Sequence, residues 1–171
     1  MRECPSLFDT VAISNSLHHL GDIDKTISEM LRVLKPNGKI IINELICDNQ
    51  NEKQLTHVYL HHLHADIETI LGITHNKTLS KQEIFDIAER NGIKNYSAAV
   101  HENEFFNTHV NLDRFSTRYK NILEKISDYP EYDKMKAIFN SLIERLYTVG
   151  VEFTSQILIV ADKNIARISD V

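Results

Sequence analysis

Glycine is scarce in this 171-residue chain, and its scarcity excludes one kind of site. The five glycines stand at positions 21, 38, 72, 92 and 150, so no two of them fall within one loop. A loop that cradles a phosphate or a nucleoside needs closely spaced glycines, because its backbone must approach the ligand without Cβ atoms in the way. No such cradle can be built from these residues.

Cysteine, basic clusters and long apolar runs are also missing. Cys4 and Cys47 are too few for a disulfide framework and lie in no metal-type spacing. A net charge of -5 without a basic cluster gives no electrostatic reason to expect nucleic acid as a partner. The longest apolar runs, such as residues 157–161, are strand-sized, and the first residues lack the apolar stretch of a signal peptide. We therefore expect no membrane partner and a cytoplasmic location.

The apolar pattern of the first 45 residues predicts a βαβ unit. Residues 8–13 have the near-continuous apolar character of a strand that is covered on both faces, as in a parallel sheet. Asp22 can cap a helix that ends before the Pro-Asn-Gly turn at 36–38, and a second strand follows at 39–43. Two strands joined by one helix should be parallel, with a right-handed crossover.

The rest of the chain continues the alternation of helices and strands. The expected elements are a helix over 51–71, a helix that follows a capping box at Ser80 and Glu83, a strand over 93–100, two helices between 112 and 149 broken at 128–130, and a strand over 156–161. We expect one α/β domain, with helices on both faces of the sheet, because 171 residues are too few for two ordinary domains.

Two motifs carry a family resemblance. The first is Phe8-Asp9-Thr10-Val11 running into Asn15-Ser16-Leu17-His18-His19-Leu20, and the second is Met30-Leu31-Arg32-Val33-Leu34-Lys35-Pro36-Asn37-Gly38-Lys39. Together they resemble the fourth and fifth strands, with the intervening helix, of class I S-adenosylmethionine-dependent methyltransferases of the small-molecule type. The resemblance implies a Rossmann-like sheet, mostly parallel with an antiparallel final strand. It also implies a single partial domain over 1–171, with a helical insertion at 111–150.

The same resemblance implies a cofactor and the absence of the N-terminal part of the domain that would hold it. The cofactor would be S-adenosylmethionine, and the reaction would be methyl transfer to a small-molecule substrate. In that family a glycine-rich loop and an acidic residue that hold the cofactor precede everything seen here, so we expect a domain truncated at its N-terminus. The strand over 8–13 would then be an unpaired edge, which predicts a homodimer or pairing with another chain.

The resemblance places the cofactor beside the loop after the first strand. The residues implied as its contacts are Ser14, Asn15, Ser16, Leu17 and His18. His19 is implied as a general base for an oxygen or nitrogen nucleophile, and a mechanism that relies on positioning alone stays open beside it. The alternative interpretation is a polar loop that caps the next helix, with one histidine packed on the sheet.

Four further residues are expected to border the substrate. Glu44 ends the second strand, where it would either contact a substrate or cap a turn. Tyr59, His62 and His64 lie on the helix expected over 51–71, which would act as a lid.

The histidines of that helix also invite a metal interpretation. His57 and His61 are four residues apart and would share a helix face, and a third ligand could come from Glu52, Asp66 or His75. We favour a solvated or substrate-facing helix and assign no metal ligand. Two other functions compete with the enzyme: a non-catalytic or split methyltransferase-like module, and a His-rich metal-binding protein.

Overall fold

The computed structural model describes residues 7–102, 104–108 and 110–163, which are built around a four-stranded sheet. The strands are β1 (Phe8–Ser14), β2 (Leu34–Leu45), β3 (Ser97–His101) and β4 (Gln156–Asp162), in the order β1-β2-β4-β3. β1 and β2 are parallel, and β4 is antiparallel to both of its neighbours, so β1, β2 and β3 share one direction. The predicted α/β class and the antiparallel final strand are confirmed.

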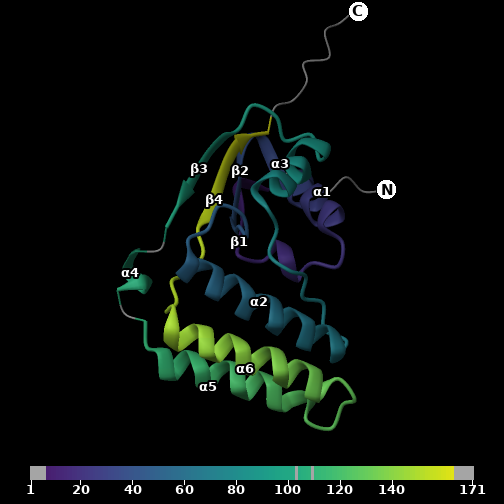
Figure 1. Ribbon diagram of the computed structural model, residues 1–171. Coiled ribbons are helices and arrows are strands. Elements are labelled where there is room, and N and C mark those ends of the chain that lie inside the picture. Colours follow the sequence, from purple (N-terminus) through teal and green to yellow (C-terminus); the bar gives the residue numbers. More distant parts are fainter. Residues whose placement is uncertain (1–6, 103, 109, 164–171) are drawn as a thin grey trace, which may run out of the picture.

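Two helices cover one face of this sheet. α1 (Ile23–Val33) begins at Asp22, whose carboxylate accepts the Lys25 N–H at 2.9 Å, and α3 (Lys81–Arg90) begins at the predicted capping box. Figure 1 shows both helices on the same side of the strands. The fully buried residues of this core include Leu17, Ile27, Leu34, Ile40, Ile42, Ile84, Ile157 and Ile159.

The opposite face of the sheet carries no helix in the part of the chain that the structure describes (Figure 1). Its side chains, among them Ala12, Ile41, Leu158 and Val160, are exposed or half-buried. The expectation of helices on both faces is therefore wrong for this part. The reason is topological: the steps from β1 to β2 and from β2 to β3 move across the sheet in the same direction, so two right-handed crossovers put both helices on one face.

The predicted Pro-Asn-Gly turn lies inside β2 as an irregularity of the strand. Phe8 pairs with Leu34 and Thr10 with Lys39, so a two-residue step on β1 faces a five-residue step on β2. A Cβ on Gly38 would lie 2.7 Å from Leu34 Cδ1, a distance that real Cβ atoms essentially never show. Glycine is therefore required where the extra residues fold back on the strand.

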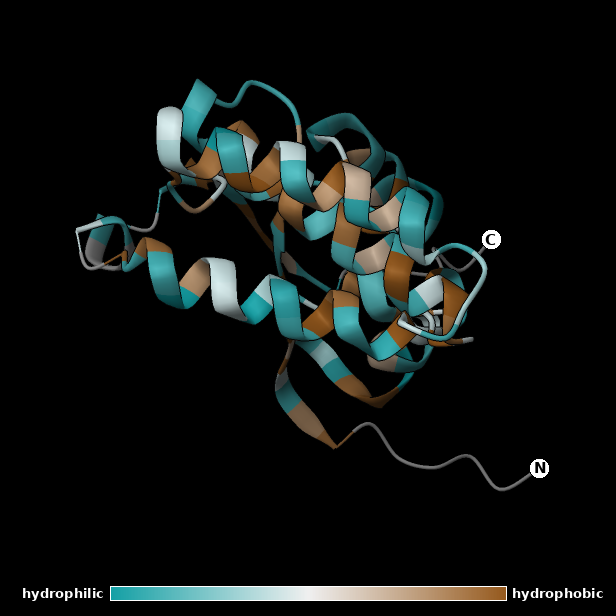
Figure 2. Ribbon diagram, turned by 60° about the horizontal axis from the view of Figure 1, so that its bottom comes forward, coloured by the Kyte–Doolittle hydropathy of each residue, from teal (hydrophilic) through white to brown (hydrophobic). Residues whose placement is uncertain are grey.

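A helical layer lies beyond the carboxyl end of β2. It consists of α2 (Glu52–Ile70), α5 (Leu112–Leu123) and α6 (Tyr132–Thr148), and the short segment η2 (Glu124–Ile126) directly follows α5. The two other short helical segments are η1 (Leu17–His19), after β1, and α4 (Glu104–Asn107), after β3. Apolar and polar residues alternate along these helices in Figure 2. Their shared core includes Leu60, Leu63, Ile67, Tyr119, Leu123, Ile126 and Leu146. The two helices predicted between 112 and 149 are confirmed.

The third predicted strand begins later than expected. β3 starts at Ser97 instead of residue 93, because Asn95 has a left-handed φ of 54° and Ile93 is buried against the sheet core. No described helix has both the length and the apolar composition that crossing a lipid bilayer requires.

Candidate functional site

A completely buried carboxylate, Glu44, organises the loop after β1. One of its oxygens accepts the backbone N–H groups of Ser16 at 3.0 Å and Leu17 at 2.6 Å. The other accepts the N–H of Leu45 at 2.9 Å and lies 2.9 Å from Nδ1 of His18. Because a carboxylate that accepts three backbone N–H groups is an acceptor, the proton of the His18 contact belongs on Nδ1 of the ring.

This anchoring divides the predicted cofactor contacts into two groups. Ser14 and Asn15 are exposed at the end of β1, with Asn15 in the left-handed region at a φ of 48°, and Ser16 is half-buried. Leu17 and His18 point inward, Leu17 into the apolar core. Glu44 already satisfies the backbone donors of Ser16 and Leu17, and Asn43 bonds both the Ser14 hydroxyl and the Asn15 N–H. The exposed side chain of Asn15 is therefore the part of the loop that is most open to a ligand.

The burial of Glu44 favours the turn-cap interpretation over direct contact with a substrate. Its exposed fraction is 0%, and both of its oxygens are occupied by groups of the chain itself. A side chain so placed acts on a ligand through the loop that it holds.

His19 is the exposed histidine at the end of the loop. Its ring centroid lies 4.3 Å from that of His18 and 4.2 Å from that of His75. Desolvation lowers the pKa of His19, and the neighbouring His18 lowers it further. The imidazole is therefore mostly neutral at pH 7 and can accept a proton.

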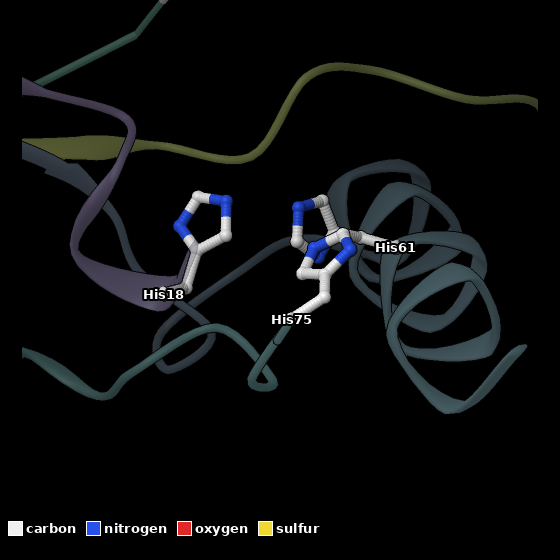
Figure 3. A group of neighbouring side chains, drawn as sticks. All are labelled: His18, His61 and His75. Atoms are coloured by element: carbon white, nitrogen blue, oxygen red, sulfur yellow. The ribbon is translucent and has the colours of Figure 1, made fainter. Parts of the chain in front are cut away.

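Three histidines from separate elements meet behind this loop. His18 comes from η1, His61 from α2, and His75 from the connection between α2 and α3 (Figure 3). One ring nitrogen of each lies within 4.8 Å of those of the other two. Nδ1 of His61 and Nε2 of His75 are buried and have no hydrogen-bond partner.

Burial keeps two of these rings, His61 and His75, neutral. Burial, reinforced by the surrounding histidines, lowers the pKa of His61 to about 2, and burial lowers that of His75 to about 4. Glu68 of α2 lies 2.7 Å from Nδ1 of His75, which is the same arrangement that Glu44 makes with His18. Two of the three rings thus have a carboxylate on Nδ1.

The residues predicted to line the substrate pocket do not lie on one surface of α2. Tyr59 is 41% exposed and has the Arg145 guanidinium of α6 5.5 Å from its ring centre. His62 Nε2 lies 2.7 Å from the Thr78 hydroxyl, whereas His64 Nε2 lies 3.0 Å from Glu68. Only His64 is close to the histidine cluster, with its ring centroid 4.9 Å from that of His75.

His64 also borders an open groove between α2 and α5. The groove has a volume of about 550 Å³ and is lined by His64, Glu68, Arg114, Arg118, Asn121, Ile122 and Lys125. Three cations against one carboxylate make it a suitable place for a polar small molecule that carries negative charge.

The histidine pair suggested by the four-residue spacing is not the one that the fold assembles. His57 is buried, and its Nδ1 accepts the N–H of Thr154 at 3.1 Å, which gives it a structural role. Burial lowers the pKa of His57 to about 4, and its ring centroid stands 6.3 Å from that of His61. The sequence suggests His75 as a possible third metal ligand beside His57 and His61, but the residue spacing gives no indication that His18 or Glu68 lies nearby.

The loop after β1 lies in a segment of the chain that matches a known protein family. Residues 5–42 match the family described as a methyltransferase domain, and this segment contains β1, the loop, α1 and the first part of β2. Over this segment the chain is similar to that family, and the match includes both motifs that carry the resemblance.

Two curated methyltransferases resemble it in sequence. A sterol 4-C-methyltransferase of Caenorhabditis elegans is 42% identical over 60 residues, which is 34% of this chain and 18% of that protein. An uncharacterised methyltransferase of Schizosaccharomyces pombe is 26% identical over 88 residues, which is 52% of this chain and 28% of that protein. The matched part of the chain thus spans less than a third of either relative.

The same fold occurs in a solved structure. A cyclopropane-fatty-acyl-phospholipid synthase-like protein of Lactobacillus casei superposes with a TM-score of 0.68 at 13% identity, covering 92% of this chain and 56% of that protein. At this identity the likeness concerns the fold, and it agrees with the Rossmann-like class I sheet expected from the two motifs.

Proposed function

We propose that the chain takes part in S-adenosylmethionine-dependent methyl transfer to a small-molecule substrate. The observation that carries this proposal is the loop after β1. This loop lies in the segment that matches the methyltransferase domain, and the buried Glu44 fixes its conformation through hydrogen bonds to its backbone. Ligands of open α/β sheets bind beyond the carboxyl ends of the strands, which is where this loop lies.

The described residues fit one side of such a cofactor. Ser14, Asn15 and Ser16 would form a polar wall, while Leu17 and His18 would hold that wall in place from the inside. The described part of the chain has no closely spaced glycines, so the nucleoside side would have to be completed by other residues. The cofactor would supply the methyl group on a sulfonium, whose leaving group needs no proton.

His19 would act on the substrate. Its lowered pKa leaves the ring free to accept a proton from an oxygen or nitrogen nucleophile at pH 7. The groove lined by His64 and Lys125 would hold the rest of the substrate, and its excess of cations favours a molecule with an anionic group. Tyr59 and His62 lie further along α2 and would contribute only to a larger substrate.

Calorimetric titration tests the cofactor part of the proposal. S-adenosylmethionine and S-adenosylhomocysteine would be titrated into the 171-residue chain and into a version extended to any upstream reading frame. Asn15→Gly removes the side chain but tolerates the left-handed φ, and Asn49→Gly is its matched control, with a φ of 56° away from the loop. We expect Asn15→Gly to weaken binding roughly fivefold, the equivalent of about one hydrogen bond, and Asn49→Gly to leave it unchanged.

Absence of binding to both versions would favour a non-catalytic or split module. The outer edge of β1 has no strand paired to it in residues 7–163 as described, and Phe8 on this edge is 51% exposed. A parallel strand edge of this kind pairs readily with another chain. Light scattering measures the oligomeric state. A dimer of the parent chain that becomes a monomer in Val11→Pro would support that module.

A further inference from the structure

We propose that His18, His61 and His75 bind one divalent transition-metal ion, with zinc as the best fit. This site goes beyond the proposed methyl transfer and does not depend on it. Its three imidazoles come from η1, α2 and the connection that follows α2, so the ion would join the loop of the sheet to the helical layer (Figure 3).

The geometry is close to that of an assembled site. One ring nitrogen of each residue already lies within 4.8 Å of the other two. A tetrahedral zinc ion with Zn–N bonds of about 2.1 Å holds its ligand nitrogens about 3.4 Å apart. Each pair of nitrogens would therefore have to approach by up to about 1.4 Å, which is less than about 1 Å of movement for each ring and which side-chain rotation can provide.

The hydrogen bonds select the ligand atoms. Nδ1 of His18 faces Glu44 and Nδ1 of His75 faces Glu68, so each ring turns its Nε2 toward the cluster. Nε2 of His75 and Nδ1 of His61 are buried without a partner, a costly state for a polar atom. A carboxylate on the distal nitrogen is the usual support of a metal-binding histidine, because it fixes the tautomer and makes the ligand nitrogen more basic.

The donor atoms of the cluster also suit a transition-metal ion. Three imidazole nitrogens favour zinc or a similar borderline ion over calcium or magnesium, which prefer oxygen ligands. Three protein ligands leave the fourth tetrahedral position to water or to a donor atom of a substrate.

A second group, formed by His19, Glu68 and His75, is the competing arrangement. It is the weaker one, because Glu68 already holds His64 with one oxygen and His75 with the other. Binding there would require at least one of these contacts to break.

Metal content measured by mass spectrometry after equilibrium dialysis tests the proposal on the untagged full chain. With zinc as the probe, we expect about one equivalent per chain, and with cobalt, the visible absorption bands of a tetrahedral complex. His18→Asn and His75→Asn are the sharpest variants, since an asparagine amide can still donate to Glu44 or Glu68 but lacks the ligand nitrogen. His61→Gln removes the unpartnered Nδ1 in the same way.

We expect each of the three variants to reduce bound zinc at least tenfold while the far-ultraviolet circular dichroism stays unchanged. His101→Asn is the control: this exposed histidine on β3 bonds Asn43 and should leave the stoichiometry at one. His19→Asn should also retain the ion, because His19 is outside the preferred set.

Two results would overturn the proposal. One is the absence of bound zinc at a tenfold excess of the ion over the folded chain. The other is loss of the ion in His19→Asn together with retention in His61→Gln, which would assign the ion to the competing group. Neither result bears on S-adenosylmethionine binding, so this proposal and the proposed function can fail separately.

Discussion

Replacing Glu44 with alanine should destabilise the fold far more than the loss of an ordinary carboxylate. The change would leave the N–H groups of Ser16, Leu17 and Leu45 without an acceptor in a site from which water is excluded. A buried donor without a partner costs about 1–3 kcal/mol, and breaking a buried charged contact costs about 3–5 kcal/mol. Since some water will enter the space that the side chain vacates, we expect a loss of about 3–5 kcal/mol.

Glu44→Gln distinguishes the contribution of the negative charge from that of the hydrogen-bond acceptor, because it removes the first and keeps one oxygen of the second. The amide oxygen can still accept the N–H groups of Ser16 and Leu17, whereas the amide nitrogen would face His18 and the N–H of Leu45. We expect a smaller loss of about 2 kcal/mol. The amide would also reverse the tautomer of His18, because its NH₂ group donates where the carboxylate accepted.

Urea denaturation of the full chain, followed by circular dichroism, measures both changes, and nitrogen-15 shifts of the imidazole report the tautomer of His18. Glu29→Gln is the matched control: that carboxylate is exposed and pairs only with Arg32, so no measurable change is expected. If Glu44→Ala cost less than about 1 kcal/mol, the buried carboxylate would not be organising the loop, and the reasoning would be refuted.

Three further changes test other parts of the fold. His57 is buried as the neutral imidazole with a pKa of about 4, whereas the unfolded chain binds that proton below pH 6.5, so stability should fall as the pH decreases from 6.5 toward 4. Between pH 7.5 and pH 5 this residue should account for about 2 kcal/mol, so parallel urea titrations of His57→Asn should show a pH dependence smaller by that amount, while the contributions of His61 and His75 remain. Gly38→Ala should cost about 1–3 kcal/mol, because its new methyl group would collide with Leu34. Gly21→Ala is the control: the nearest atom to its methyl group would be 3.9 Å away, so thermal melts of the two variants should show a nearly neutral effect for this one. Ser80→Ala should cost about 1 kcal/mol through loss of the α3 cap, and equal stability of this variant and the parent would contradict the capping box.

Local signals in the sequence predicted the elements of the fold well. The cap at Asp22 and the capping box at Ser80 each act within four residues, so the sequence alone contains both partners. The turn at Gly38 was misplaced because the same residues can end a strand or bulge within it, and pairing with β1 decides between the two.

The site was harder to predict than the fold. The residues of the loop after β1 were found through a motif, but their division into outward and inward side chains depends on Glu44, which stands 28 residues from Ser16. His18 and His61 approach each other only because α2 passes the end of the sheet, and no spacing in the sequence encodes such a meeting. Long-range polar contacts of this kind come from packing and not from periodicity.

The two apolar cores of the chain have no buried side chain in common. Substitutions without shared partners have additive effects on the free energy of unfolding, so Ile42→Ala in the sheet and Leu146→Ala in the helical layer should combine without coupling. Sequence change in one apolar core is thereby insulated from the other core, and the histidine cluster is a polar contact that joins the two halves. The apolar core of α2, α5 and α6 can diversify over evolutionary time while the loop after β1 keeps the geometry that Glu44 imposes on it.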